Sequence, residues 1–165
     1  LDSAREAGAE VEMVRLAGKN IAPCDGCLAC EKTGACHIKD DMQEMADKMV
    51  AADALLIGTP VYWLSVNAQA KALIDRTYSL YMNGRKLRGK LGGAVVAATR
   101  EGCYNAISLL NGFFISHRMF VVGWALGYGH RKGEVKQDEE GAREARNLGK
   151  AVVKQLQQRE KAAVQ

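Results

Sequence analysis

The sequence predicts an α/β fold, in which a doubly wound parallel sheet carries helices on both faces. Short, continuous apolar runs occur at 54–58, 91–99 and 119–123, and such runs are typical of strands buried on both sides. Segments with apolar residues at three- and four-residue spacing, typical of amphipathic helices, alternate with these runs. Alternation of strand and helix builds a parallel sheet, and right-handed crossovers then place helices on both of its faces.

The elements follow one another along 165 residues, which we interpret as one domain. The chain begins in a short helical segment that Gly8 ends, and a first strand follows. We expect Asp41 and Glu44 to form a capping box at the start of the next helix, and we expect His117 to end a later helix as a cation that suits the helix dipole. The predicted helices are 2–7, 42–50, 66–77, 104–117 and 138–158, and the predicted first strand is 10–16.

One unit of a doubly wound nucleotide-binding domain does not occur in the sequence. Such domains open with a strand, a phosphate-cradling loop and a helix, whereas this chain begins within the helix. Without a central first strand, its neighbours would keep unpaired backbone groups in the interior, which is costly. We therefore expect the biological protein to be longer by about 30 residues, which is one strand-plus-helix unit.

Composition excludes several classes of protein. Apolar residues make up 48% of the chain and charged residues 25%, as in ordinary globular proteins. The net charge is +4, and the basic residues are scattered, so we expect no nucleic-acid partner. The apolar runs are too short to span a bilayer, and residues 1–9 do not form a signal peptide. We therefore expect no membrane partner and a cytoplasmic location.

A loop at 23–40 contains four of the five cysteines, spaced C-x2-C-x2-C-x5-C. Gly26 and Gly34 give this loop the permissive backbone that wrapping around a small centre needs. A total of five cysteines, four of them closely spaced, without a secretory signal indicates metal binding or redox chemistry in a reducing compartment. The candidate metal ligands are Cys24, Cys27, Cys30 and Cys36, and Cys103 is a bystander.

The spacing of the cysteines leaves more than one occupant open. Three cysteines at this pitch and a fourth nearby can each hold one iron of a cubane cluster. A zinc site more often uses two pairs separated by a longer finger, which fits this packed quartet less well. Empty thiols, or a redox-active pair formed by Cys24 and Cys27, also remain open.

The sequence resembles the iron–sulfur flavoproteins, within the broader group of flavodoxin-like NADPH-dependent FMN reductases. The resemblance covers nearly the whole chain, and the matching stretches are 23–36, 37–42, 58–63, 70–76, 129–134 and the closing helix. It implies a flavodoxin-like sheet, FMN bound in a dimer or tetramer, and a nearby 4Fe–4S cluster on the cysteine quartet. The chain departs from the family pattern in one respect, because the N-terminal phosphate loop of the type G-S-x-R-x-x-x-N-T is absent.

The flavin is expected beyond the carboxyl ends of the strands, where ligands bind in open α/β sheets. Tyr62 and Trp63 offer flat faces for stacking, although such aromatics can also serve in packing or at an interface. Arg100 can stabilise negative charge on reduced flavin, or it can be a solvated arginine. The expected cofactor-binding residues are Thr59, Pro60, Val61, Tyr62, Trp63, Leu64 and Ser65 after one strand, and Thr99, Arg100, Glu101 and Gly102 after the next. No catalytic side chain is expected, because the flavin carries the chemistry.

These features predict an oxidoreductase that takes electrons from NAD(P)H through FMN to a 4Fe–4S cluster, and then to a small-molecule or protein acceptor. Three alternatives remain: a cluster-free NAD(P)H:FMN or quinone reductase, a non-catalytic electron carrier, and a zinc or thiol sensor. A homodimer or homotetramer is expected, because an exposed aromatic loop at 62–64 is better covered than left in water.

Overall fold

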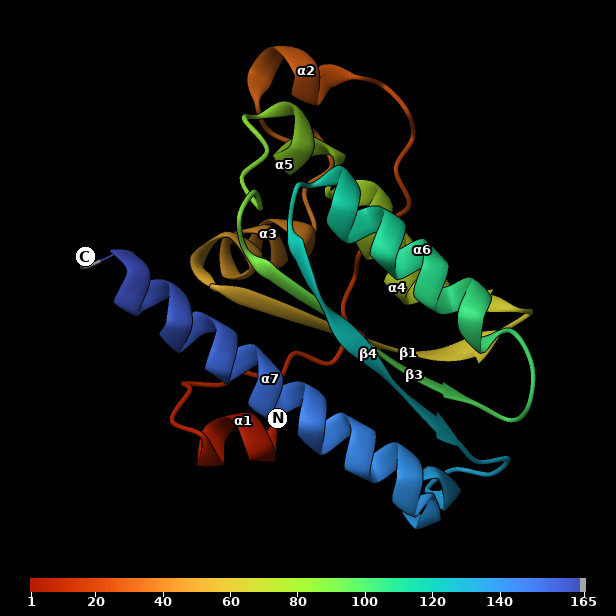
Figure 1. Cartoon of the computed structure of the whole chain (residues 1–165). Coiled ribbons are helices and arrows are strands. Elements are labelled where there is room, and N and C mark those ends of the chain that lie inside the picture. Colours follow the sequence, from red (N-terminus) through yellow and green to blue (C-terminus); the bar gives the residue numbers. More distant parts are fainter. Residues whose placement is uncertain (164–165) are drawn as a thin grey trace.

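The computed structural model describes residues 1–163 and contains a four-stranded sheet in the order β2-β1-β3-β4 (Figure 1). The strands β1 (Ala54–Tyr62), β3 (Leu91–Ala98) and β4 (Phe120–Tyr128) are parallel. The short strand β2 (Ser65–Val66) returns antiparallel against the end of β1. The predicted α/β class with a parallel sheet is confirmed, and β2 is an antiparallel addition that the sequence did not predict.

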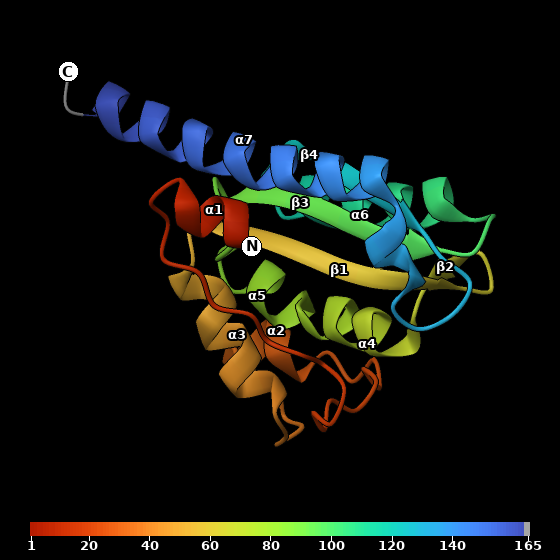
Figure 2. The same ribbon diagram turned by 90° about the horizontal axis from the view of Figure 1, so that it is seen from below.

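Helices cover both faces of the sheet, as predicted (Figure 2). On one face, α1 (Asp2–Glu6) packs against the long α7 (Glu139–Ala163), which lies along β4. On the other face lie α3 (Met42–Ala51), α4 (Ala68–Arg76) and α6 (Cys103–Ser116). The remaining helices are short, and they are α2 (Ala29–Thr33), α5 (Tyr78–Met82) and the 3-10 helix η1 (Glu134–Gln137).

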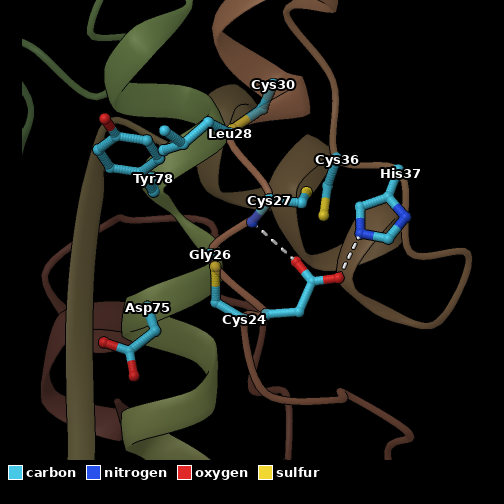
Figure 3. A pocket seen from close by; sticks show the side chains of 10 residues that line it. Cys24, Gly26, Cys27, Leu28, Cys30, Cys36, His37, Asp75 and Tyr78 are labelled. Carbon is cyan, nitrogen blue, oxygen red and sulfur yellow. Dashed lines mark hydrogen bonds and ion pairs between the residues drawn. The ribbon is translucent and has the colours of Figure 1, made fainter.

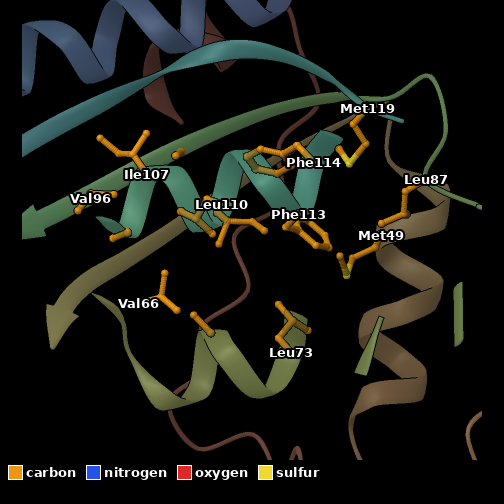
Figure 4. Packing of buried hydrophobic residues seen from close by; sticks show 14 of the residues in the cluster. Met49, Val66, Leu73, Leu87, Val96, Ile107, Leu110, Phe113, Phe114 and Met119 are labelled. Carbon is orange, nitrogen blue, oxygen red and sulfur yellow. The ribbon is translucent and has the colours of Figure 1, made fainter. Parts of the chain in front are cut away.

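The larger hydrophobic core lies under α6 (Figure 4). Leu110 and Phe114 on α6 are fully buried against the sheet, together with Leu87. A smaller cluster on the opposite face joins Leu91 and Ala125 of the sheet to α7. Because both faces of β3 are covered, its nearly continuous apolar sequence is explained.

Several predicted boundaries were wrong. The segment 10–16 is not a strand, because a strand needs a hydrogen-bonded neighbour and none of the described strands pairs with it. It still contributes Val14 and Leu16 to the larger core. The predicted strands 54–58 and 119–123 continue to Tyr62 and Tyr128. The predicted helix 66–77 begins only at Ala68, because Asn67 caps it by accepting a 2.9 Å hydrogen bond from the Ala70 amide.

The capping box predicted at Asp41 and Glu44 was also wrong, because it lies one residue earlier. Asp40 Oδ1 accepts from the Met42 amide at 3.0 Å, and Gln43 Oε1 accepts from the Asp40 amide at 3.1 Å. The Asp41 and Glu44 carboxylates instead bind the Asn20 amide and Lys19, each at 2.7 Å.

His117 is not a charged helix terminus. Its side chain is buried, and its Nε2 lies 3.0 Å from the Thr77 hydroxyl. Burial, and to a lesser extent the charge of Arg85, lowers the pKa of His117 to about 4. The imidazole is therefore neutral near pH 7 and contributes no charge to the helix dipole. No helix among residues 1–163 combines the length and apolar character that crossing a membrane requires.

Candidate functional site

A tight hairpin turn at the end of β1 presents the aromatic side chains that the sequence singled out. Tyr62 pairs with Ser65, so the turn consists of Trp63 and Leu64 alone. Both have positive φ angles, 46° and 62°, as in the type I′ turns that usually contain Asn-Gly. Trp63 is 99% exposed and Tyr62 is 62% exposed. Backbone strain and a large apolar side chain in water together indicate a functional surface.

Thr59 lies lower in the same hairpin and does not face solvent. It is buried, its hydroxyl donates to the Pro60 carbonyl at 2.9 Å, and it accepts from the Asn67 amide at 3.1 Å. The hydroxyl therefore holds the hairpin against the start of α4. Thr59 therefore helps to shape the turn, and its expected role in binding the flavin stays a prediction.

The loop after β3 meets this turn, as the sequence predicted from strand order. Gly102 has a φ of 84°, and a Cβ atom there would lie 2.6 Å from the Leu64 Cα. Only glycine permits this approach. A hollow of about 540 Å³ lies between the two segments, which is within the range of ligand sites. It is lined by Val61, Trp63, Leu64, Thr99, Arg100 and Glu101. Arg100 is highly exposed, and its Nη2 lies 3.4 Å from Glu101 Oε1.

The four clustered cysteines line a second hollow, of about 390 Å³ (Figure 3). The predicted backbone freedom of Gly26 and Gly34 is confirmed, with φ angles of 70° and 71° on either side of α2. Asp75 and Tyr78, from the end of α4 and the start of α5, form the opposite wall. The spacing C-x2-C-x2-C-x5-C thus brings every member of the quartet to one small space.

The spacing of the sulfur atoms bears on the kind of metal centre. Cysteine sulfurs that share one tetrahedral zinc ion lie about 3.8 Å apart, given Zn–S bonds of about 2.3 Å. Among the described residues, the potential ligand atoms that all lie within 4.8 Å belong to Asp25, Cys27 and His37, which include a single cysteine. Within residues 1–163, no three sulfurs of the quartet therefore lie within 4.8 Å of one another, as the cysteine ligands of one zinc ion would. A cluster in which each cysteine binds a different iron does not require so close an approach.

Electrostatics around the quartet favours a positively charged occupant. Burial raises the pKa of the Cys30 thiol, and the nearby sulfurs of Cys36, Cys27 and Cys24 raise it further. Four thiolates in so small a space repel one another, and bound metal removes this penalty because it deprotonates and neutralises its ligands.

Asp25 and His37 form a polar contact beside the quartet that sequence reasoning missed. His37 Nε2 lies 2.7 Å from Asp25 Oδ2, and the Cys27 amide donates to Asp25 Oδ1 at 3.2 Å. The Cys27 thiol and amide, followed by His37, hold the pKa of Asp25 below its usual range. The sequence signal for this contact was available, since Asp25 lies between two cysteines and His37 follows the last one.

Side chains after β2 fasten the cysteine segment to the body of the protein. The buried Arg76 guanidinium forms an ion pair with Asp40, with Nη1 at 2.7 Å from Oδ2 and Nη2 at 3.0 Å from Oδ1. The Tyr78 hydroxyl donates to Glu31 at 2.7 Å, and Asn83 donates to the carbonyl of Gly34 at 3.1 Å. Sequence reasoning did not identify any of these anchors.

The two hollows lie at opposite ends of α4. The hairpin leads directly into the N-cap residue Asn67, whereas Asp75 near the helix C-terminus lines the cysteine hollow. With a rise of about 1.5 Å per residue, these positions are separated by about 12 Å along the helix axis. A single rigid helix therefore sets the spacing between the aromatic turn and the sulfur atoms.

Comparison with known proteins finds relatives whose descriptions all name flavin or NAD(P)H chemistry. A family model described as NADPH-dependent FMN reductase matches residues 1–131. An iron–sulfur flavoprotein of Methanocaldococcus jannaschii is 42% identical over 162 residues, covering 92% of this chain and 83% of its own length. An iron–sulfur flavoprotein of Archaeoglobus fulgidus is 34% identical over 153 residues, covering 92% of this chain and 68% of its own. An NAD(P)H dehydrogenase (quinone) of Geotalea uraniireducens is 31% identical over 145 residues, covering 84% of this chain and 67% of its own length.

Solved structures support the same fold. A flavone reductase superposes with a TM-score of 0.70 at 18% identity, covering 93% of this chain and 55% of that chain. A flavodoxin from the Archaea superposes with a TM-score of 0.60 at 14% identity, covering 94% of this chain and 84% of that chain. At these identities the likeness concerns the fold alone, and it is flavodoxin-like.

Proposed function

The chain belongs to the NADPH-dependent FMN reductase family, and on that premise we propose that FMN binds at the hairpin turn and a 4Fe–4S cluster binds the cysteine quartet. The protein is a flavodoxin-like flavoprotein oxidoreductase with a nicotinamide donor. The observation that carries the proposal is the pair of hollows joined by α4, one lined by Trp63 and the other by the four cysteines.

The residues around the turn have distinct parts in flavin binding. Tyr62 and Trp63 present flat apolar surfaces, which support stacking against an isoalloxazine ring. Gly102 keeps the second loop close to the turn, so that the backbone of both segments borders the ring. Arg100, at the rim, favours an anionic occupant. When bound, FMN supplies the ability to accept a hydride and to release electrons singly.

The cysteine quartet fits an iron–sulfur cluster better than it fits zinc. No three of the four sulfur atoms lie within 4.8 Å of one another among the described residues, yet all four cysteines line the same hollow. The ligand assignment is Cys24, Cys27, Cys30 and Cys36. The physiological acceptor is then a one-electron acceptor, either a small molecule or a protein.

We also propose that the protein is a homodimer or homotetramer. Trp63 and Tyr62 stand out from the turn with most of their surface in water. A second copy of the chain that covers the turn would remove this apolar surface from solvent and enclose the flavin. Native mass measurement at working concentration tests this assembly, and a monomer that retains FMN would contradict it.

Anaerobic purification with FMN, followed by iron, sulfide and flavin assays, tests the cofactor assignment. We expect about four irons for each chain, as a cubane cluster requires, together with bound FMN that NADPH bleaches. Cys30→Ser is expected to lose the cluster and keep the flavin, whereas the matched control Cys103→Ser, remote from the quartet, is expected to keep both. Bound zinc, or a protein that FMN does not colour, would contradict the proposal.

Bleaching kinetics separate this assignment from two related functions. Iron below about one atom per chain with FMN retained would indicate a cluster-free reductase. A flavin that NADPH alone does not bleach at a turnover-competent rate would indicate an electron carrier that is reduced by a protein partner.

A further inference from the structure

A buried arginine closes the cysteine segment at both of its ends. Arg76 Nη1 donates to the Ala22 carbonyl at 2.8 Å, and Nη2 donates to the Ile38 carbonyl at 3.3 Å. Ala22 lies two residues before Cys24, and Ile38 lies two residues after Cys36. One guanidinium therefore joins the chain entering the quartet to the chain leaving it.

Asp40 completes this closure from the other side. Its carboxylate accepts from both Nη atoms of Arg76, and it also accepts from the Ala22 amide at 2.9 Å. The side chains of the pair are 0% and 3% exposed, so the interaction is screened little by water. Because the pair is neutral as a whole, Asp40 offsets the charge of Arg76 without consuming all of its donors.

The remaining donor of the guanidinium is free. Of its five N–H groups, the four on the Nη atoms are directed to oxygen partners, while Nε is buried and has no hydrogen-bond partner among residues 1–163. An unpaired buried N–H is costly, so this group calls for an explanation.

The Cys36 sulfur is the further group that acts on this guanidinium. Burial lowers the pKa of Arg76, but Asp40 and then the charge of Cys36 raise it above its usual value. Arg76 Nη2 donates to the Ile38 carbonyl, two residues after Cys36, so the guanidinium lies beside the chain that carries this cysteine. A metal-bound thiolate is a far better acceptor than a thiol.

We propose that Arg76 is a positioning residue for the cysteine quartet, which closes the segment 22–38 and donates its Nε–H to the sulfur of Cys36 when that cysteine binds the cluster. This inference rests on the cluster assignment proposed above. A hydrogen bond to a ligating sulfur withdraws electron density and stabilises the reduced cluster, so it raises the reduction potential.

The variant Arg76→Lys tests the donor, because lysine keeps the positive charge and loses Nε. At the midpoint potential of the wild-type cluster, we expect the ratio of oxidised to reduced cluster to rise about tenfold, which corresponds to about 59 mV for a one-electron couple. Asn83→Ala is the matched control, because it removes another anchor of the segment, at Gly34, and leaves the Arg76 donors in place. Its potential is expected to equal that of the wild type.

The outcomes separate this inference from the cluster assignment. A wild-type protein without iron contradicts the cluster assignment itself. Iron in all three proteins with one shared potential overturns the role of Nε, since a purely structural anchor would change the iron content alone. An equal shift in Asn83→Ala would overturn it as well, because the shift would then follow from any loosening of the segment.

A second measurement does not need the variant to retain its cluster. The ¹⁵Nε–¹Hε resonance of Arg76 can be followed in the apo wild-type chain while Cd²⁺ is added to the quartet. We expect this proton to move downfield and to exchange with water more slowly, because it gains a thiolate acceptor. A resonance that stays unchanged at full cadmium occupancy would overturn the inference.

Discussion

Replacement of Trp63 by asparagine is expected to stabilise the protein. A residue with a side chain in the left-handed region costs about 1–2 kcal/mol, whereas asparagine tolerates this conformation. Trp63 has a φ of 46° and is 99% exposed, so the change removes strain and loses almost no buried surface. The free energy of unfolding should rise by about 1 kcal/mol, which is a gain of about 2–4 °C in Tm.

The same variant should bind FMN more weakly, by about two- to tenfold, because an aromatic stacking contact is worth about 0.5–1.5 kcal/mol. Urea unfolding of the apo chain and flavin fluorescence titration measure the two effects. Ile115→Asn is the control, since Ile115 is also highly exposed but has no positive φ, and no gain in stability is expected there. A Trp63→Asn protein that is less stable than the wild type would refute the strain argument, and unchanged FMN affinity would refute stacking.

Three further changes test the packing and the buried charges. Gly102→Ala should destabilise by about 2–4 kcal/mol in urea unfolding, because its Cβ meets backbone at 2.6 Å, while Gly112→Ala, with nothing within 4 Å, should stabilise by about 0.5–1 kcal/mol. Because the pKa of His117 is lowered to about 4, the contribution of this neutral side chain to the free energy of unfolding is full above about pH 6.5 and falls by about 3 kcal/mol toward pH 4. The variant His117→Gln should lack this dependence on pH. Asp40→Asn should cost about 3–5 kcal/mol at pH 7. Burial alone would raise the pKa of Asp40, but its hydrogen bonds hold that pKa below its usual value. The stability that the Asp40 carboxylate contributes is therefore lost only as the pH falls below about 4, and the unfolding free energy of Asp40→Asn should not show this fall in acid.

The sequence predicted the parallel strands well, because a short continuous apolar run between two amphipathic helical segments is typical of a strand buried on both faces. The same strand order correctly predicted that the segment after β1 and the loop at Thr99–Gly102 share one edge of the sheet. The turn itself could not be predicted, since Trp63 and Leu64 lack the Asn-Gly signature of a two-residue hairpin. Local propensity therefore gives no signal for this turn.

The anchoring of the cysteine segment was also beyond sequence reasoning. Arg76 lies at the end of an amphipathic helix, where an exposed cation is the ordinary expectation, and its partner Asp40 is 36 residues away. Nothing in periodicity links two such positions. The same pairing explains the shifted capping box, because Asp40 serves the helix terminus and the arginine together, which leaves Asp41 to Asn20.

The closure by Arg76 has a consequence for biosynthesis. Ala22 precedes its arginine partner by 54 residues, so the ribosome synthesises the whole cysteine segment before the residue that fastens it. At about 5–20 residues per second the nascent thiols stay unfastened for several seconds. Delivery of iron to the proposed cluster is therefore expected to follow translation of α4, and ribosome-bound chains truncated before Arg76 should capture less metal than chains truncated well beyond it.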